Sequence, residues 1–142
     1  MPVQKTDIYG CSVSGEGKCD CLVEILQDCN VCDASSYMCC GKPMEKIEPK
    51  TAAQEGKEKH VPVIEKIDGG FKVTVGGTPH PMESDHWIQW IELTVGKQVL
   101  REYKDPGDEP TATFMVACGC CGSDCGEPTA REHCNKHGLW SS

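Results

Sequence analysis

The sequence lacks three features that would each point to a familiar class of protein. No apolar run approaches the roughly 20 residues that a membrane helix requires, which argues against a membrane role. A net charge of −8 argues against a nucleic-acid partner, because phosphate binding depends on clustered cations. Met1 is not followed by the basic segment and apolar run of a secretory leader. We therefore expect a cytoplasmic protein.

Cysteine, in contrast, is abundant. The 142 residues include 12 cysteines, close to the share at which cysteine rather than apolar burial organises a fold. Disulfides are the usual explanation in small secreted proteins, but the missing leader favours bound metal. Seven of the cysteines lie in the first forty residues, where residues 22–26 are the only short apolar stretch. We predict a metal-nucleated module over residues 1–45, followed by a main domain over residues 46–142.

The main domain has the pattern of an all-β fold. Residues 71–75 alternate apolar and polar side chains between two pairs of glycines, and residues 86–95 are rich in aromatic and β-branched side chains. Residues 98–103 can return as a hairpin partner, and residues 111–117 make a further strand. Short strands without convincing helical periodicity predict an antiparallel β-sandwich with little helix.

Four of the five histidines and one cysteine of this domain are candidate metal ligands. A single histidine is weak evidence for a site, so the combination carries the argument. Four imidazoles and one thiolate favour a redox iron over a closed zinc site, and five ligands leave one octahedral position open. The fifth histidine, His133, is expected to point away from the metal because side chains alternate along an extended chain. The candidates are His60, His80, His86, Cys134 and His137.

The segments around these residues resemble the desulfoferrodoxin family. The resemblance is carried by EKHVPVIE at residues 58–65, PHPM at 79–82, HWIQWIE at 86–92 and CNKHGLW at 134–140. It implies an immunoglobulin-like β-sandwich whose mononuclear iron is held by the four histidines in the plane and by the cysteine on the axis. It also implies a superoxide reductase, which reduces superoxide by one electron to hydrogen peroxide.

The same resemblance implies residues and partners that serve the open face of the iron. Glu58 and Lys59 match a Glu-Lys pair that lies at the substrate face in the family. Lys59 would attract anionic superoxide to an acidic protein, and Glu58 would ligate the resting ferric iron. Without His60 beside them, the two would read as part of a solvated charged run. The electron donor is expected to be rubredoxin-like and the protein a homodimer.

The N-terminal module resembles the rubredoxin-like iron module of the family through Tyr9-Gly10-Cys11 and CCGKPM at residues 39–44. The family has two residues between its first two cysteines, whereas residues 12–18 separate Cys11 from the next cysteine here. Aligning residues 22–26 with the family's similar apolar strand implies that a second iron is held by Cys11, Cys19, Cys39 and Cys40.

Two alternatives remain open for this module. Cys29 and Cys32 have the spacing of a standard thiolate knuckle and could replace Cys11 and Cys19. An iron–sulfur cluster is also possible, because seven cysteines exceed the four that one iron needs.

A second cysteine-rich segment is not explained by the family pattern. Its four thiols could hold another metal or pair with spare N-terminal cysteines. Two other functions also stay open for the chain: an electron-transfer protein of the iron–sulfur or rubredoxin kind without superoxide chemistry, and a zinc-stabilised binding module. The segment contains Cys118, Cys120, Cys121 and Cys125.

Overall fold

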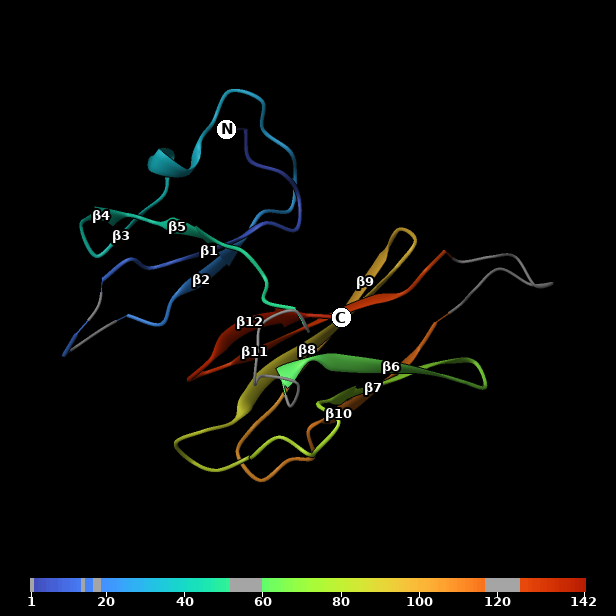
Figure 1. Cartoon of the computed structure of the whole chain (residues 1–142). Helices are drawn as coiled ribbons and strands as arrows, with labels where there is room; N and C mark the ends of the chain where they lie inside the picture. Colours follow the sequence, from blue (N-terminus) through green and yellow to red (C-terminus); the bar gives the residue numbers. More distant parts are fainter. Residues whose placement is uncertain (1, 14, 17–18, 52–59, 117–125) are drawn as a thin grey trace. The chain divides into compact units, whose positions relative to one another are not determined.

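The chain forms two compact units, Met1–Glu48 and Pro49–Ser142, which Figure 1 shows in a computed structural model. The boundary expected near residue 45 lies close to this division. The residues that the structure describes include the 3-10 turn η1 (Ala34–Ser36) but no α-helix, and none of them forms a helix that could span a membrane. The predicted all-β fold is confirmed. The structure describes residues 2–13, 15–16, 19–51, 60–116 and 126–142.

The first unit is a small sheet with long loops. β1 (Ile8–Gly10) pairs antiparallel with β2 (Leu22–Glu24) on one side and with β5 (Glu45–Ile47) on the other. A short hairpin of β3 (Met38–Cys39) and β4 (Lys42–Pro43) precedes β5. The core cluster of this unit consists of Val3, Tyr9, Ile25 and Met44. A core of this size buries too little apolar surface to stabilise a domain by itself, and bound metal is therefore expected to contribute to folding.

The β3–β4 hairpin turns at a cysteine. Cys40 and Gly41 have φ angles of 53° and 76°, the left-handed values that both residues of a type I′ turn adopt. Glycine adopts this conformation freely, whereas for a residue with a Cβ the conformation costs about 1–2 kcal/mol. The hairpin therefore accepts backbone strain at Cys40, and it places two adjacent cysteines at its tip.

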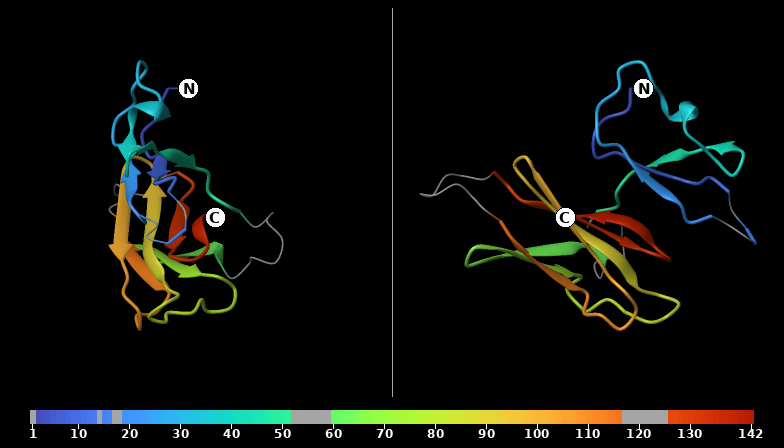
Figure 2. Two further views of the ribbon diagram at one scale, coloured as in Figure 1. Left: turned by 90° about the vertical axis from the view of Figure 1, so that its left-hand side faces the viewer. Right: turned by 180° about the vertical axis from the view of Figure 1, so that it is seen from behind.

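The second unit is an antiparallel sandwich of two sheets (Figures 1 and 2). The first sheet has the order β10-β7-β6 and the second the order β12-β11-β8-β9. The first consists of β6 (Pro62–Ile67), β7 (Gly70–Val75) and β10 (Thr111–Met115). The second consists of β8 (Ile88–Val95), β9 (Gln98–Tyr103), β11 (Thr129–Cys134) and β12 (Gly138–Ser141).

Each of the four strands predicted in the main domain is present. The strands expected over residues 71–75, 86–95 and 98–103 correspond to β7, β8 and β9, although β8 begins two residues later than expected. The strand expected over 111–117 corresponds to β10, and Ala117 lies outside the described residues. The predicted sandwich is therefore confirmed.

Side chains from both sheets form one core between them. Val73 and Val75 of β7 are fully buried, as are Leu93 of β8 and its neighbours on the same face. The first sheet needs one close backbone approach, because a Cβ on Gly70 would lie 2.0 Å from the carbonyl oxygen of Phe114. Glycine at this position lets β7 and β10 pair at the edge of the core.

The ladder between β11 and β8 is irregular at its last residue. His133 pairs with Trp90 but Cys134 pairs with Ile88, so Gln89 is an extra residue on β8. The register shift allows Ile88 and Ile91 both to be fully buried although they are three residues apart. Cys134 itself is fully buried, where the regular strand ends.

Candidate metal centre

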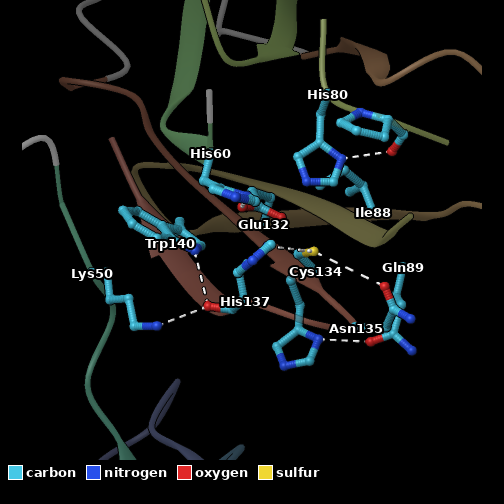
Figure 3. Close-up of polar contacts among 12 residues, drawn as sticks. Lys50, His60, His80, Ile88, Gln89, Glu132, Cys134, Asn135, His137 and Trp140 are labelled. Atoms are coloured by element: carbon cyan, nitrogen blue, oxygen red, sulfur yellow. Dashed lines mark hydrogen bonds and ion pairs between the residues drawn. The ribbon is translucent and has the colours of Figure 1, made fainter. Parts of the chain in front are cut away.

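Four histidine rings of the second unit surround one point in a nearly square arrangement, and Figure 3 labels three of them, His60, His80 and His137. Going round the square, the ring centroids of successive histidines are 4.6, 4.7, 4.9 and 4.5 Å apart, in the order His60, His80, His86, His137 and back to His60. The His60 and His86 centroids are 6.4 Å apart, as the diagonal of such a square should be. Four imidazoles are thus placed as four ligands in one plane would be.

Each histidine is presented by a loop or strand end at one edge of the sandwich. His60 lies just before β6, and His80 and His86 lie in the connection from β7 to β8. Cys134 ends β11, and His137 lies in the turn to β12. The ligand atoms of His60, His80, Cys134 and His137 all lie within 4.8 Å of one another. His86 adjoins this group, with its Nε2 3.2 Å from Nδ1 of His137.

Hydrogen bonds determine which nitrogen of a ring can bind metal. Nδ1 of His80 lies 2.6 Å from the carbonyl oxygen of Pro81, which can only accept a hydrogen bond. Nδ1 must therefore carry the proton, which leaves Nε2 as the donor atom of the neutral ring. For His137 the opposite nitrogen faces the site, because its Nδ1 lies 3.8 Å from Sγ of Cys134.

Asn135 joins the two loops that carry His86 and His137. Its side-chain amide donates to the carbonyl of Asp85 at 2.9 Å, and its Oδ1 accepts from the backbone N–H of Trp87 at 2.9 Å. These bonds hold the residues on both sides of His86 against the residue that follows Cys134. Outer contacts of this kind orient metal ligands and are worth a measurable part of the affinity.

The turn that carries His137 is fixed from its other side. The carbonyl oxygen of His137 accepts a hydrogen bond from Nζ of Lys50 at 2.9 Å and one from Nε1 of Trp140 at 3.1 Å (Figure 3). The indole of Trp140 also stacks on the ring of His60, at 5.1 Å and 17°. One buried tryptophan therefore contacts two of the four histidines.

A buried carboxyl group, Glu132, adjoins the site. Its Oε1 lies 4.0 Å from Nδ1 of His60, and both residues are fully buried. Burial raises the pKa of Glu132 to about 9, so the carboxyl group is neutral near pH 7. Burial likewise raises the pKa of the Cys134 thiol. A bound metal cation reverses that direction, because a coordinating thiol is deprotonated.

The donors present fit iron. Four imidazoles and one buried thiol match a redox metal with mixed nitrogen and sulfur ligands, and structural zinc sites usually have only four ligands. Glu58 and Lys59, expected at the open face, lie outside the described residues. His133 is turned away as predicted, since it stacks on Trp90 at 5.9 Å and its Nδ1 lies 2.7 Å from Oε1 of Gln89.

Two residues of the site, Glu132 and Asn135, were missed in the sequence analysis. Glu132 alternates with Ala130 and Cys134, so strand periodicity could have placed it on the inner face. Asn135 lies inside the segment that resembles the family, but nothing in its local pattern reveals its partners 48 and 50 residues earlier.

A second donor set lies in the first unit. The sulfur atoms of its four cysteines all lie within 4.8 Å of one another. Sγ of Cys39 is 3.7 Å from Sγ of Cys19 and 3.9 Å from Sγ of Cys40. A backbone hydrogen bond lowers the pKa of Cys19, while hydrogen bonds with Cys11 and Cys19 raise the pKa of Cys39. The set is Cys11, Cys19, Cys39 and Cys40, the first of the two sets considered above.

The structure does not gather the rival set. Cys29 and Cys32 are bonded to each other as a disulfide, and Cys21 is an exposed free thiol. The second cysteine-rich segment, residues 118–125, lies outside the described residues. The first unit therefore presents one four-thiol donor set and one separate cysteine pair.

Known proteins resemble this chain over its second unit or over nearly its whole length. The family model described as Desulfoferrodoxin matches residues 52–142. A desulfoferrodoxin of Syntrophotalea carbinolica is 42% identical over 139 residues, which cover 98% of this chain and 97% of that protein. A superoxide reductase of Pyrococcus horikoshii is 38% identical over 101 residues, covering 60% of this chain and 84% of its own length.

The fold agrees with these sequence matches. The crystal structure of the superoxide reductase from Treponema pallidum has a TM-score of 0.65 with this chain at 26% identity, and the match covers 96% of this chain and 95% of that one. Family model, full-length relative and solved structure point the same way. The chain belongs to the desulfoferrodoxin family.

Proposed function

We propose that the chain is a superoxide reductase, in which superoxide, one electron and two protons give hydrogen peroxide. The observation that carries this proposal is the nearly square set of four histidines with the buried thiol of Cys134 beside it. Relatives named desulfoferrodoxin and superoxide reductase support the same reaction. Its site is a mononuclear iron held by His60, His80, His86, His137 and Cys134.

The protein's own groups prepare this site for a one-electron reduction. When bound, ferrous iron would supply the electron, and the Cys134 thiolate would add electron density to it. The Pro81 carbonyl holds His80 with Nε2 toward the metal, and Asn135 holds the loops around His86 and Cys134. Burial of Cys134 keeps bulk water from the thiolate. Five protein ligands would leave one position of an octahedral iron for the substrate.

Glu58 and Lys59 complete the proposal at the substrate side. Lys59 supplies local positive charge that raises the encounter rate of an anion with a protein of net charge −8. Glu58 would be a further ligand of the resting ferric iron. Both roles come from the resemblance of residues 58–65 to the family.

The first unit has a supporting role in this proposal. Its four thiols would hold a second iron, and a rubredoxin-like protein is the proposed electron donor. The donor, the homodimer and the cytoplasmic location stay predictions.

The test compares ligand variants with a histidine that lies beside the site. Protein purified without oxygen is examined by ultraviolet-visible and electron paramagnetic resonance spectroscopy, with iron and zinc counted per chain, before and after superoxide is added. We expect a ferric thiolate absorption that is lost in His60→Ala and Cys134→Ser. His133→Ala is the matched control and should retain it, because His133 stacks on Trp90 outside the square.

Peroxide yield separates the enzyme from an electron carrier. A superoxide reductase forms one peroxide for each superoxide and releases no oxygen from the substrate. A protein that transfers electrons through its four-thiol site alone would show the iron signal of that site but no superoxide consumption beyond the spontaneous rate. A colourless protein that holds only zinc would overturn the enzymatic proposal.

A further inference from the structure

The cysteine pair Cys29–Cys32 has no role in either metal-donor set. It lies in the loop that follows β2, in the sequence Cys29-Asn30-Val31-Cys32. All residues of the loop from 26 to 33 are exposed except these two cysteines, which are partly buried. Their side chains pack against the small core of the first unit, which Cys39 of the four-thiol set also contacts. The pair thus lies at the surface of the module but is anchored to its core.

The loop is held in place by backbone contacts that do not depend on the disulfide. The backbone N–H of Cys29 donates to the carbonyl of Val3 at 3.0 Å. The Asp28 carboxylate accepts from the backbone N–H of Lys5 at 2.7 Å. The two Cα atoms are 5.6 Å apart, a usual separation for bonded cysteines. The backbone can therefore keep the two sulfur atoms together whether the bond is made or broken.

A purely structural role accounts poorly for this bond. A disulfide stabilises a fold mainly by closing a loop of the unfolded chain, and a loop of about 15 residues is worth about 3 kcal/mol. The bond between Cys29 and Cys32 joins positions only three apart, so it removes much less chain entropy. The Cys-x-x-Cys spacing is instead the one that disulfide oxidoreductases use for reversible exchange.

We propose that Cys29 and Cys32 form a reversible dithiol/disulfide site, distinct from both metal centres, that exchanges two electrons with a protein dithiol of the thioredoxin class. A donor thiolate attacks one sulfur, the Cys29–Cys32 bond breaks and a mixed disulfide forms. The second donor thiol then attacks the donor's own sulfur in that mixed disulfide. The donor ends as a disulfide, and Cys29 and Cys32 end as thiols that have gained two electrons and two protons.

The geometry assigns different roles to the two sulfur atoms. The backbone N–H of Cys32 donates to Sγ of Cys29 at 3.1 Å. This hydrogen bond stabilises negative charge on the sulfur of Cys29, so Cys29 is the better leaving thiolate. Cys32 is then the sulfur that the incoming thiolate attacks. Val31 beside it is 96% exposed and offers an apolar contact for the approaching protein.

The first experiment uses the unmodified metal-loaded protein. Samples are equilibrated without oxygen in buffers of reduced and oxidised dithiothreitol, then alkylated and mapped by mass spectrometry. We expect Cys29 and Cys32 to change together from unlabelled to labelled in one reversible two-electron step. Cys21→Ser should leave this step unchanged, and Cys32→Ser should abolish it. If both residues are labelled at every potential, the proposal is wrong.

The second experiment tests the assigned direction and excludes a ligand role. A thioredoxin whose resolving cysteine is replaced by serine should form a mixed disulfide with Cys32 rather than Cys29. A Cys29→Ser, Cys32→Ser double variant should keep the same number of metal ions per chain as the parent. Loss of one metal ion per chain would make the two cysteines ligands, and attachment at Cys29 would overturn the assignment of the attacked sulfur. Neither result depends on superoxide activity, so failure here would not affect the proposed reductase.

Discussion

The two donor sets differ in what holds their ligands before any metal binds. The histidine square lies at one edge of the sandwich, and the loops that carry it are held by hydrogen bonds and by a buried tryptophan. The four thiols lie on loops and on a two-residue hairpin strand, over a core cluster of four buried side chains. The histidine site is organised by the fold of the second unit, whereas the first unit depends on the metal that its four thiols bind.

Metal removal should show the difference between the two units most clearly. Chelation under reducing, oxygen-free conditions should unfold residues of the first unit and leave the sandwich intact, because only the first lacks a core large enough to persist. Hydrogen exchange should show full loss of protection in the β1–β2 pairing of Tyr9 with Val23, and retained protection in β8 and β11. Equal loss in both units would contradict the comparison.

A cavity in the core of the sandwich should have the next largest effect on stability. Leu93 is fully buried in the core between the sheets, so Leu93→Ala should lower the free energy of unfolding of the second unit by about 2–5 kcal/mol. Denaturant unfolding followed by tryptophan fluorescence reports this unit, since Trp87, Trp90 and Trp140 all belong to it. Val99→Ala is the control and should change little, because Val99 is 47% exposed.

Loss of the loop connection should weaken the histidine site without unfolding it. Asn135→Ala removes the bonds to Asp85 and Trp87, so metal affinity should fall by about 10-fold or more. Competition with a chelator measures the change. Lys136→Ala in the same turn should have little effect, because its contact with Asp85 is exposed and 3.5 Å long. Similar losses in both variants would mean that the turn as a whole, not Asn135, sets the affinity.

The smallest predicted effect is a change in the pKa of Asp33, in the first unit. Hydrogen bonds from the side chain and the backbone N–H of Ser35 lower the pKa of Asp33. A depressed carboxyl pKa adds stability above the unfolded value, and this stability is lost as pH falls through the folded value. Ser35→Ala should therefore raise the pKa of Asp33 in an NMR titration. Ser36→Ala should leave it nearly unchanged, because Ser36 bonds the Asp33 backbone through its own N–H.

Sequence could predict the regular parts of this molecule because their signals are local. The alternation in residues 71–75 indicated β7, and the family motifs brought together four distant histidines and Cys134. The β8 irregularity was not predictable, because the extra residue Gln89 is defined only by its pairing with β11. The choice between two cysteine sets was open for a similar reason, since spacing favoured Cys29 and Cys32 while only the folded loops show that they bond to each other.

The contact between Trp140 and His60 gives the protein a built-in optical reporter. An indole that is fully buried emits at short wavelength, and a paramagnetic ion in an adjoining ring cluster quenches that emission. Filling and emptying of the histidine site should therefore be visible as a change in intrinsic fluorescence, without a label and without turnover. Trp140→Phe, which keeps a stacked ring, would silence this signal and leave the emission of Trp87 and Trp90 as the background.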